Sequence, residues 1–262
     1  MTSLLLLQQF PPSGSAFIQG ARRGIGLALV EALLGMASVG QVYATCRRPQ
    51  QASRLQQLAA EYPQRLSLLP LEMTDEASIA AAVATVAEHT GALHLLINCA
   101  GVLHDPQQGW YPEKKLADIR VEALHYSFAV NAVGPLLMAK HSLPLFRHQQ
   151  RAVLANISAR VGSISDNRLG GWYAYRGSKA AQNMFTRTIA IEYGRRAPNT
   201  ICVALHPGTT DTDLSQPFQS HVPDAKLFSP EFTAQRLLSV IDGLNPADSG
   251  GFFAWDGTPI PW

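Results

Sequence analysis

Short apolar runs alternate with helical stretches along this chain, and the alternation restricts its fold more than any other feature. The run LHLLINCAG at 93–101 is apolar at successive positions, so a strand there would present apolar side chains on both faces. Such strands need cover on both sides, which a parallel sheet between two layers of helices provides. Because right-handed crossovers join parallel strands, we expect an α/β fold: a single doubly wound domain of the Rossmann type over 1–262.

The helix at 75–90 is expected to begin with acids, which suit the positive end of a helix dipole. Pro135 and Pro144 should disturb a long helix locally.

Ligands of this fold bind at the carboxyl ends of the strands. The unusual residues of the chain follow these ends: Gly20, Arg47, Asn98, Ser158 and Pro207. We expect strands at 15–20, 41–46, 66–73, 93–101, 151–158 and 200–208, and helices at 24–35, 51–62, 75–90, 116–147 and 175–193.

The composition argues against several classes of protein. The formal net charge is only +2, too small to indicate nucleic acid as the main partner. The leucine run at 4–7 is far shorter than the ~20 apolar residues of a membrane span, and it lacks the flanks of a secretory signal. Cys46, Cys99 and Cys202 show neither a disulfide framework nor metal-ligand spacing. We therefore expect a cytoplasmic protein without a metal site, in which each cysteine is a small buried apolar residue.

A glycine-rich loop, QGARRGIG, follows the first expected strand. Gly20, Gly24 and Gly26 have the spacing G-x-x-x-G-x-G, which differs from the G-x-G-x-x-G of the standard dinucleotide fingerprint. Glycines permit a tight turn and a close approach of the backbone, and a helix start offers free N–H groups to a pyrophosphate. The alternative is a turn with incidental glycines. The position between the first strand and the first helix favours the nucleotide site.

Arginines surround this loop where an acid would indicate NAD. A site specific for NAD usually carries an acid near the end of the second strand. Here that strand ends ATCRR, with Arg47 and Arg48, and Arg23 lies inside the glycine loop. Guanidinium groups bind an additional 2′-phosphate well, although the alternative is that these arginines are merely solvated. We therefore favour NADP(H) over NAD(H) as the cofactor.

The stretch YAYRGSK places Tyr175 four residues before Lys179, on one face of the expected helix. Such a pair also arises by chance in helices. A nearby ammonium favours phenolate, so we expect Lys179 to lower the pKa of Tyr175 and to adapt it for proton transfer near neutral pH.

Taken together, these motifs resemble the short-chain dehydrogenase/reductase family over nearly the whole chain. QGARRGIG resembles its cofactor loop, NCAG at 98–101 its Asn-Asn-Ala-Gly segment, and HPGTTDT at 206–212 its Pro-Gly-x-x-x-Thr segment. YAYRGSK matches its Tyr-x-x-x-Lys motif, and Asn131 resembles its active-site asparagine. The stretch NISARVGSISDNRLGGWYAYRGSKAA and the ending DGTPIPW are most similar to the C-factor/Sniffer branch of carbonyl reductases.

The resemblance implies an NADPH-dependent reduction of an aldehyde or ketone, in which the cofactor delivers hydride. It implies that Tyr175 transfers the proton, that Lys179 also binds ribose hydroxyls, and that Asn131 holds a water in a proton relay. It further implies a homodimer or higher homo-oligomer. The expected catalytic residues are Tyr175, Lys179, Asn131 and Ser158. The expected cofactor-binding residues are Gly20, Arg23, Gly24, Ile25, Gly26, Arg47, Arg48, Glu72, Met73, Asn98, Ala100, Gly101, Tyr175, Lys179, Pro207, Gly208, Thr210 and Thr212.

The chain departs from the family pattern at three places. Gln19 replaces a threonine, which is expected to weaken a hydrogen bond of the loop, and Cys99 replaces a second asparagine. The third departure concerns the carbonyl-orienting serine, whose usual position carries Ala159. Ser158 would then point the wrong way on a regular strand, unless a bulge or an early strand end turns it inward. We favour Ser158 slightly over the alternative, Ser163.

The long segment at 209–231 is a candidate substrate loop. Its Phe218 and Phe228, with Trp110 and Tyr111, either line an apolar pocket or are ordinary packing residues. No arginine is evidently dedicated to a carboxylate, so the substrate is expected to be a neutral carbonyl compound. His206 is expected to be structural rather than catalytic. Two alternatives remain open: an NAD-linked alcohol dehydrogenase, and a nucleotide-sensing signalling protein of the same fold.

Overall fold

The computed structural model describes residues 7–262, and most of the leucine run at 4–7 lies outside the described residues. A seven-stranded sheet in the order β3-β2-β1-β4-β5-β6-β9 forms its centre, and every neighbouring pair of strands is parallel. This confirms the predicted doubly wound α/β fold. The strands are β1 (Gly14–Gln19), β2 (Val39–Cys46), β3 (Leu66–Pro70), β4 (Leu95–Asn98), β5 (Ala152–Ile157), β6 (Thr200–His206) and β9 (Phe252–Ala254).

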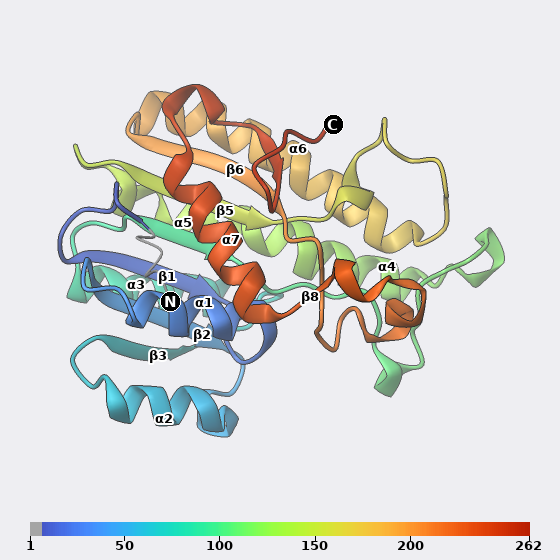
Figure 1. The fold of residues 1–262 in the computed structure, drawn as a ribbon, viewed down its shortest axis with the longest axis horizontal. Helices are drawn as coiled ribbons and strands as arrows, with labels where there is room; N and C mark the ends of the chain where they lie inside the picture. The colour runs from blue at the N-terminus through green and yellow to red at the C-terminus, as the bar shows by residue number, and fades with distance from the viewer. Residues whose placement is uncertain (1–6) are drawn as a thin grey trace.

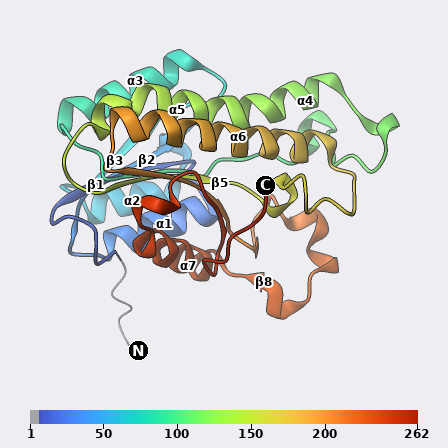
Figure 2. The same ribbon diagram turned by 90° about the horizontal axis from the view of Figure 1, so that it is seen from above.

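Helices cover both faces of the sheet (Figure 1). In the view from above, α1, α2 and α7 form one outer layer, while α3, α4, α5 and α6 form the other (Figure 2). The helices are α1 (Gly24–Leu34), α2 (Ser53–Glu61), α3 (Glu76–His89), α4 (Val121–Phe128), α5 (Gly134–Ser142), α6 (Tyr173–Arg196) and α7 (Pro230–Gly243).

The alternating side chains of the central strands supply a core to each layer. In β4, Leu95 and Ile97 pack into the core beneath α1 and α7, whereas Leu96 packs into the core beneath α3 and α5. Ile18 and Phe17 of β1 divide in the same way. All of these residues are buried, which is the physical reason that these strands are apolar at successive positions.

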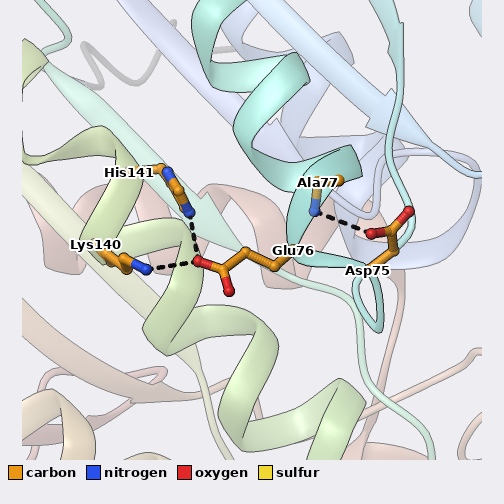
Figure 3. Close-up of polar contacts among 5 residues, drawn as sticks. All are labelled: Asp75, Glu76, Ala77, Lys140 and His141. Atoms are coloured by element: carbon orange, nitrogen blue, oxygen red, sulfur yellow. Dashed lines mark hydrogen bonds and ion pairs between the residues drawn. The ribbon is translucent and has the colours of Figure 1, made fainter.

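The acidic start of α3 has two functions (Figure 3). Asp75 caps the helix, because its Oδ1 accepts the N–H of Ala77 at 2.9 Å. Glu76 accepts from Lys140 Nζ at 2.6 Å and contacts His141 Nε2 at 2.9 Å, so it links α3 to α5. The hydrogen bond from Lys140 holds the pKa of the Glu76 carboxyl below its usual value.

The prediction of one continuous helix at 116–147 is wrong, because the structure divides this range into several helical segments. Residues 116–118 form a separate 3₁₀ turn, α4 begins only at Val121, and a π-helical turn (Ala129–Val133) separates α4 from α5. Pro135 has no N–H to donate to the carbonyl of Asn131, so the helical ladder cannot continue regularly there. A final 3₁₀ turn (Leu143–Phe146) contains Pro144. Both prolines therefore disturb the helix as predicted.

Beyond 208, the main sheet and its helix layers gain β9, a strand of three residues, and α7, and neither was predicted. A strand of three residues is too short to show a period. The sheet order also places β2 on one side of β1 and β4 on the other, so the carboxyl ends of β1 and β4 form the topological switch point. Within residues 7–262, no helix is both long and apolar enough to cross a membrane.

Candidate active site

The glycine loop lies at the switch point and approaches the end of β4 closely. Gly20 has a φ of +82°, and a Cβ there would lie 2.6 Å from the backbone N of Ala100. A Cβ on Gly26 would lie 2.2 Å from the carbonyl O of Gly20. Larger residues at either position would therefore push the loop out of place. Gln19 Oε1 accepts the N–H of Ala100 at 3.0 Å, so the glutamine at this unusual position does form a hydrogen bond that ties the two strand ends together.

Helix α1 begins inside this loop without a capping side chain. Arg23 is its N-cap residue, no side chain bonds to the first N–H groups, and no acid lies in the first turn. These N–H groups are thus available to an anion. The side chain of Arg23 forms an ion pair with Asp213, and a Cβ on Gly24 would lie 3.0 Å from Thr212 Cγ2. The glycine loop and the segment after β6 therefore lie against each other.

Two exposed arginines directly follow β2. Arg47 and Arg48 are both exposed, and no ion pair of either occurs within residues 7–262. Arg22 and Arg47 both lie near enough to Cys46 to lower the pKa of its thiol, against the larger opposing effect of burial. The sequence analysis missed Arg22, although it stands next to Arg23 in the loop. The structure thus places Arg22 among the basic groups around the end of β2.

Polar side chains line up at the ends of β4 and β5. Asn98 and Asn156 share one register, and Asn98 Nδ2 donates to Asn156 Oδ1 at 2.8 Å. Asn131, in the π-helical turn, accepts the N–H of Val102 at 2.8 Å and donates to its carbonyl at 2.8 Å. Asn131 Nδ2 also donates to Ser178 Oγ at 3.0 Å. The amide of Asn131 is therefore committed to holding the segment after β4 against α6.

Tyr175 and Lys179 lie one turn apart on α6 and face this segment. The Nζ of Lys179 is 5.8 Å from the centre of the Tyr175 ring and donates to the carbonyl of Ile157 at 2.7 Å. A Cβ on Gly101 would lie 3.4 Å from Asn131 Oδ1 and 3.7 Å from Lys179 Nζ. Glycine at 101 thus keeps space open between the asparagine and the lysine, and the structure brings together Tyr175, Lys179 and Asn131.

The expected lowering of the tyrosine pKa is not what the site shows. Burial raises the pKa of Tyr175 above its ordinary value. Burial also lowers the pKa of Lys179 to about 7, while the neighbouring Cys99 opposes this shift. Lys179 is then only partly charged near neutral pH. The effect of burial, which raises the pKa of Tyr175, therefore exceeds any lowering by the lysine. Tyr175 consequently retains its proton near neutral pH.

The hydroxyl of Ser158 has a partner that the sequence did not indicate. Strand β5 ends at Ile157, and Ser158 Oγ donates to Asn183 Oδ1 at 2.6 Å. Asn183 lies eight residues beyond Tyr175, or about 12 Å along the axis of α6. Ser163 is also buried, and its Oγ accepts the N–H of Asp166 at 3.2 Å. The Ser158 hydroxyl therefore uses its proton in the hydrogen bond to Asn183, whereas the Ser163 oxygen only accepts, and no hydrogen bond within residues 7–262 joins either hydroxyl to Tyr175.

The segment after β6 forms the remaining wall. Gly208 has a φ of +76°, and a Cβ there would lie 2.6 Å from a ring carbon of Phe228. Thr210 Oγ1 lies 2.9 Å from Thr233 Oγ1 of α7, so this hydroxyl contacts the outer helix. Thr212 contacts the glycine loop through Gly24. Of the predicted cofactor residues in this segment, Gly208 and Thr210 therefore have clear packing functions of their own.

Glu72 and Met73 follow β3 and were expected to flank the adenine. Glu72 Oε1 accepts the N–H of Thr74 at 3.1 Å, which shapes the turn before α3. Met73 is buried, and a Cβ on Gly134 would lie 2.5 Å from its Cε. Met73 thus packs under the start of α5.

The aromatic residues fall into separate groups. Phe228 packs against Phe232 and Trp255, with ring centres 4.9 and 4.7 Å away, which is ordinary packing. Phe218 instead lies 5.1 Å from Trp172, whose ring is 6.3 Å from that of Tyr175.

The sequence analysis missed Trp172. Its φ of +52° and ψ of +45° are left-handed, which costs a non-glycine residue ~1–2 kcal/mol. Its N–H donates to the carbonyl of Glu113 at 2.6 Å. The run GGW before the tyrosine was a signal for a tight turn here, although it did not indicate which residue would be strained. Trp110 packs on Tyr126 at 5.7 Å, and Tyr111 is exposed.

Together, fold and site define an α/β protein with a Tyr–Lys pair beside a glycine loop at the switch point. The family model of the short chain dehydrogenases matches residues 15–223. The C-signal protein of Myxococcus xanthus is 39% identical over 173 residues, which cover 66% of this chain and 95% of that protein. The chain therefore belongs to the short chain dehydrogenase family.

Solved structures agree with this assignment. The NADPH bound carbonyl reductase from chicken fatty liver is 34% identical with a TM-score of 0.85, and the match covers 96% of this chain and 100% of that one. Carbonyl reductase Sniffer of D. melanogaster is 28% identical with a TM-score of 0.83, with the same coverage of both chains. The predicted resemblance to the C-factor/Sniffer branch is thus confirmed.

Proposed function

We propose that this oxidoreductase uses NADPH to reduce a neutral aldehyde or ketone to the alcohol. The observation that carries the proposal is the position of the Tyr175–Lys179 pair. It lies across Gly101 from Asn131, at the switch point that also holds the glycine loop. A protonated Tyr175 suits reduction better than alcohol oxidation, because reduction needs a proton donor.

The residues at the switch point fit a dinucleotide. Gly20 and Gly26 form a cradle that a Cβ would fill, and the uncapped start of α1 offers N–H groups to a pyrophosphate. The Oδ1 of Asn98 is buried without a partner within the described chain, so this edge of the sheet holds a further acceptor. Ala100 and Gly101 would lie along the nicotinamide ribose, and Ile25 and the segment from Pro207 to Thr212 would line the pyrophosphate and the carboxamide. When bound, the cofactor supplies a hydride to the carbonyl carbon.

The side chains of this chain would then position the carbonyl and supply its proton. Tyr175 donates a proton from its hydroxyl to the carbonyl oxygen. In its protonated form, Lys179 places a positive charge beside the tyrosine, which stabilises the phenolate that results. Asn131 holds the segment after β4 in place, and its part in a water relay remains a proposal. Because the Ser158 hydroxyl donates to Asn183 and no hydrogen bond within residues 7–262 joins Ser163 to Tyr175, we assign the orientation of the carbonyl to Tyr175 alone, in place of Ser158.

The preference for NADPH rests on charge. Arg47 and Arg48 are exposed at the end of β2, where no acid is present to bind ribose hydroxyls. Arg23 is held by Asp213, so it would have to exchange one anionic partner for another. The similar chicken enzyme is NADPH bound, and the similar carbonyl reductase from Pseudomonas aeruginosa PAO1, 26% identical, was solved in complex with NADP. We therefore assign the 2′-phosphate first to Arg47.

The substrate is expected to meet an apolar wall. Trp172 lies between Tyr175 and Phe218, and Phe218 belongs to the proposed substrate loop at 209–231. The base of this loop is closed by a short ribbon, in which β7 (Thr209–Thr210) pairs with β8 (Leu227–Phe228). An apolar carbonyl compound would therefore contact Trp172 while its oxygen faces the tyrosine.

A panel of aldehydes and ketones with NADPH tests the function. Steady cofactor oxidation with at least one carbonyl supports the proposal. Binding of NADPH without turnover of any carbonyl in the panel would favour the alternative, a nucleotide-sensing signalling protein. The name of the similar C-signal protein agrees with that alternative. Turnover only with NAD and alcohols would favour a dehydrogenase. We further propose that the protein has one domain and forms a homo-oligomer. Its three free cysteines are in keeping with a cytoplasmic location, which we also propose.

A further inference from the structure

A buried glutamine contacts Lys179 from the next turn of α6. Lys179 is 2% exposed and Gln182 is 1% exposed, and they share one face of the helix. Lys179 Nζ donates to Gln182 Oε1 at 3.0 Å and to the carbonyl of Ile157 at 2.7 Å. An ammonium group has three N–H bonds. Two of them are therefore held by the protein and one remains, and the centre of the Tyr175 ring lies 5.8 Å from Nζ.

No carboxylate shares in this arrangement. The ion pairs within residues 7–262 do not include Lys179. Two titratable groups face the amine: the thiol of Cys99 after β4, and the phenol of Tyr175 on α6. Burial raises the pKa of Cys99 to about 12 and also raises that of Tyr175, so both groups are neutral near pH 7. The charge on Lys179 consequently depends on neutral acceptors, of which Gln182 is one of two.

Packing alone does not account for a glutamine at this position. Gln182 Nε2 is buried and has no hydrogen-bond partner within the described chain. A buried amide N–H without a partner destabilises the folded protein, and an apolar residue of similar length would avoid that cost. The benefit of the glutamine therefore has to lie in its oxygen, which faces the lysine.

We propose that Gln182 is a positioning residue, whose amide oxygen keeps Lys179 charged and directs its remaining N–H bond toward Tyr175. The inference rests on the proposed function, because it gives the charged lysine a part in turnover. It extends the Tyr–Lys pair by a third residue on the same helix face. Gln182 acts through Lys179 and touches neither the carbonyl nor the cofactor.

The titration of Lys179 tests this inference without any turnover. The chain has only five lysines, so NMR of lysine labelled with ¹³C at Cε gives few signals, and Lys179→Met identifies the relevant one. Gln182→Met keeps the length of the side chain and removes the acceptor. Loss of a hydrogen bond to a charged group should lower the midpoint of the Lys179 titration by about 1–2 pH units. Gln182→Glu keeps the acceptor and adds a negative charge, so it should raise the midpoint.

A matched control lies one turn further along the same face. Thr186 is buried, donates from Oγ1 to the carbonyl of Gln182 at 2.8 Å and accepts from Asn156 Nδ2 at 2.9 Å, and no hydrogen bond within residues 7–262 joins it to Lys179. Thr186→Val should therefore leave the Lys179 midpoint unchanged, even if it lowers Tm. If Gln182→Met also leaves the midpoint unchanged, the inference is wrong. If Gln182→Met does not fold, Gln182→Glu decides, because an unshifted midpoint in that variant overturns the inference as well.

Activity supplies a second readout, which separates this inference from the proposed function. In Gln182→Met, the alkaline decline of kcat should move to lower pH by the same amount as the NMR midpoint. Gln182→Glu should restore the wild-type decline or move it to higher pH. Absence of turnover in the wild type would defeat the proposed function and leave the NMR result standing. A fall in Tm without any shift of the midpoint would show a merely structural glutamine.

Discussion

Removal of one oxygen atom, in Tyr175→Phe, should abolish turnover while it leaves the fold intact. No hydrogen bond of the Tyr175 hydroxyl occurs within residues 7–262. The centre of the Tyr175 ring lies 6.3 Å from that of the Trp172 ring and 5.8 Å from Lys179 Nζ. Phenylalanine keeps both ring contacts. The free energy of unfolding should therefore change by no more than ~0.5 kcal/mol. Loss of a positioned general acid should lower kcat by about 10²–10⁴-fold, or ~2.7–5.4 kcal/mol in the barrier.

The assay follows NADPH oxidation with the best carbonyl of the panel, together with the dissociation constant of NADPH and thermal unfolding. Tyr193→Phe is the matched control on the same helix. The Tyr193 hydroxyl donates to the carbonyl of Ala139 at 2.7 Å, far from the site. That variant should lose ~0.5–1.5 kcal/mol of stability and keep its activity. If Tyr175→Phe retains more than roughly a tenth of wild-type kcat, the tyrosine is not the proton donor.

Four further outcomes are expected. NADPH should bind at least about tenfold more tightly than NADH, and Arg47→Ala should remove most of this difference; equal dissociation constants in the wild type would reject the assignment. Ser158→Ala and Ser163→Ala should each keep kcat within about tenfold, and a loss of about 10²-fold in either would restore that serine as a carbonyl donor. Burial lowers the pKa of His94, whose Nδ1 accepts a backbone N–H, so stability should be constant above about pH 6.5 and fall at lower pH; equal acid sensitivity in His94→Asn would contradict this. Light scattering should show a homo-oligomer that Met184→Glu dissociates, because Met184 is a 65% exposed apolar residue on α6; a wild-type monomer at micromolar concentration would refute this.

The sequence was sufficient for the fold class and for the residues of the Tyr–Lys pair. Strands that are apolar on both faces can be covered only in a layered α/β fold, and one helical turn necessarily places Lys179 beside Tyr175. The glycines at 20 and 26 were also readable, because only glycine tolerates the close backbone contacts found there. These features depend on single residues or on the spacing of residues along one strand or helix. They do not depend on which distant segment packs against that element.

Tertiary structure alone decided the rest. Ser158 was assigned to the substrate from the sequence, but its hydroxyl meets Asn183, because α6 packs against the end of β5. The pKa of Tyr175 was expected to fall, but burial raises it, and burial depends on every element around the site. Arg23 pairs with Asp213 and Gln182 contacts Lys179 for the same reason. Side-chain partners and desolvation follow from how distant segments pack, which no pattern along the chain records.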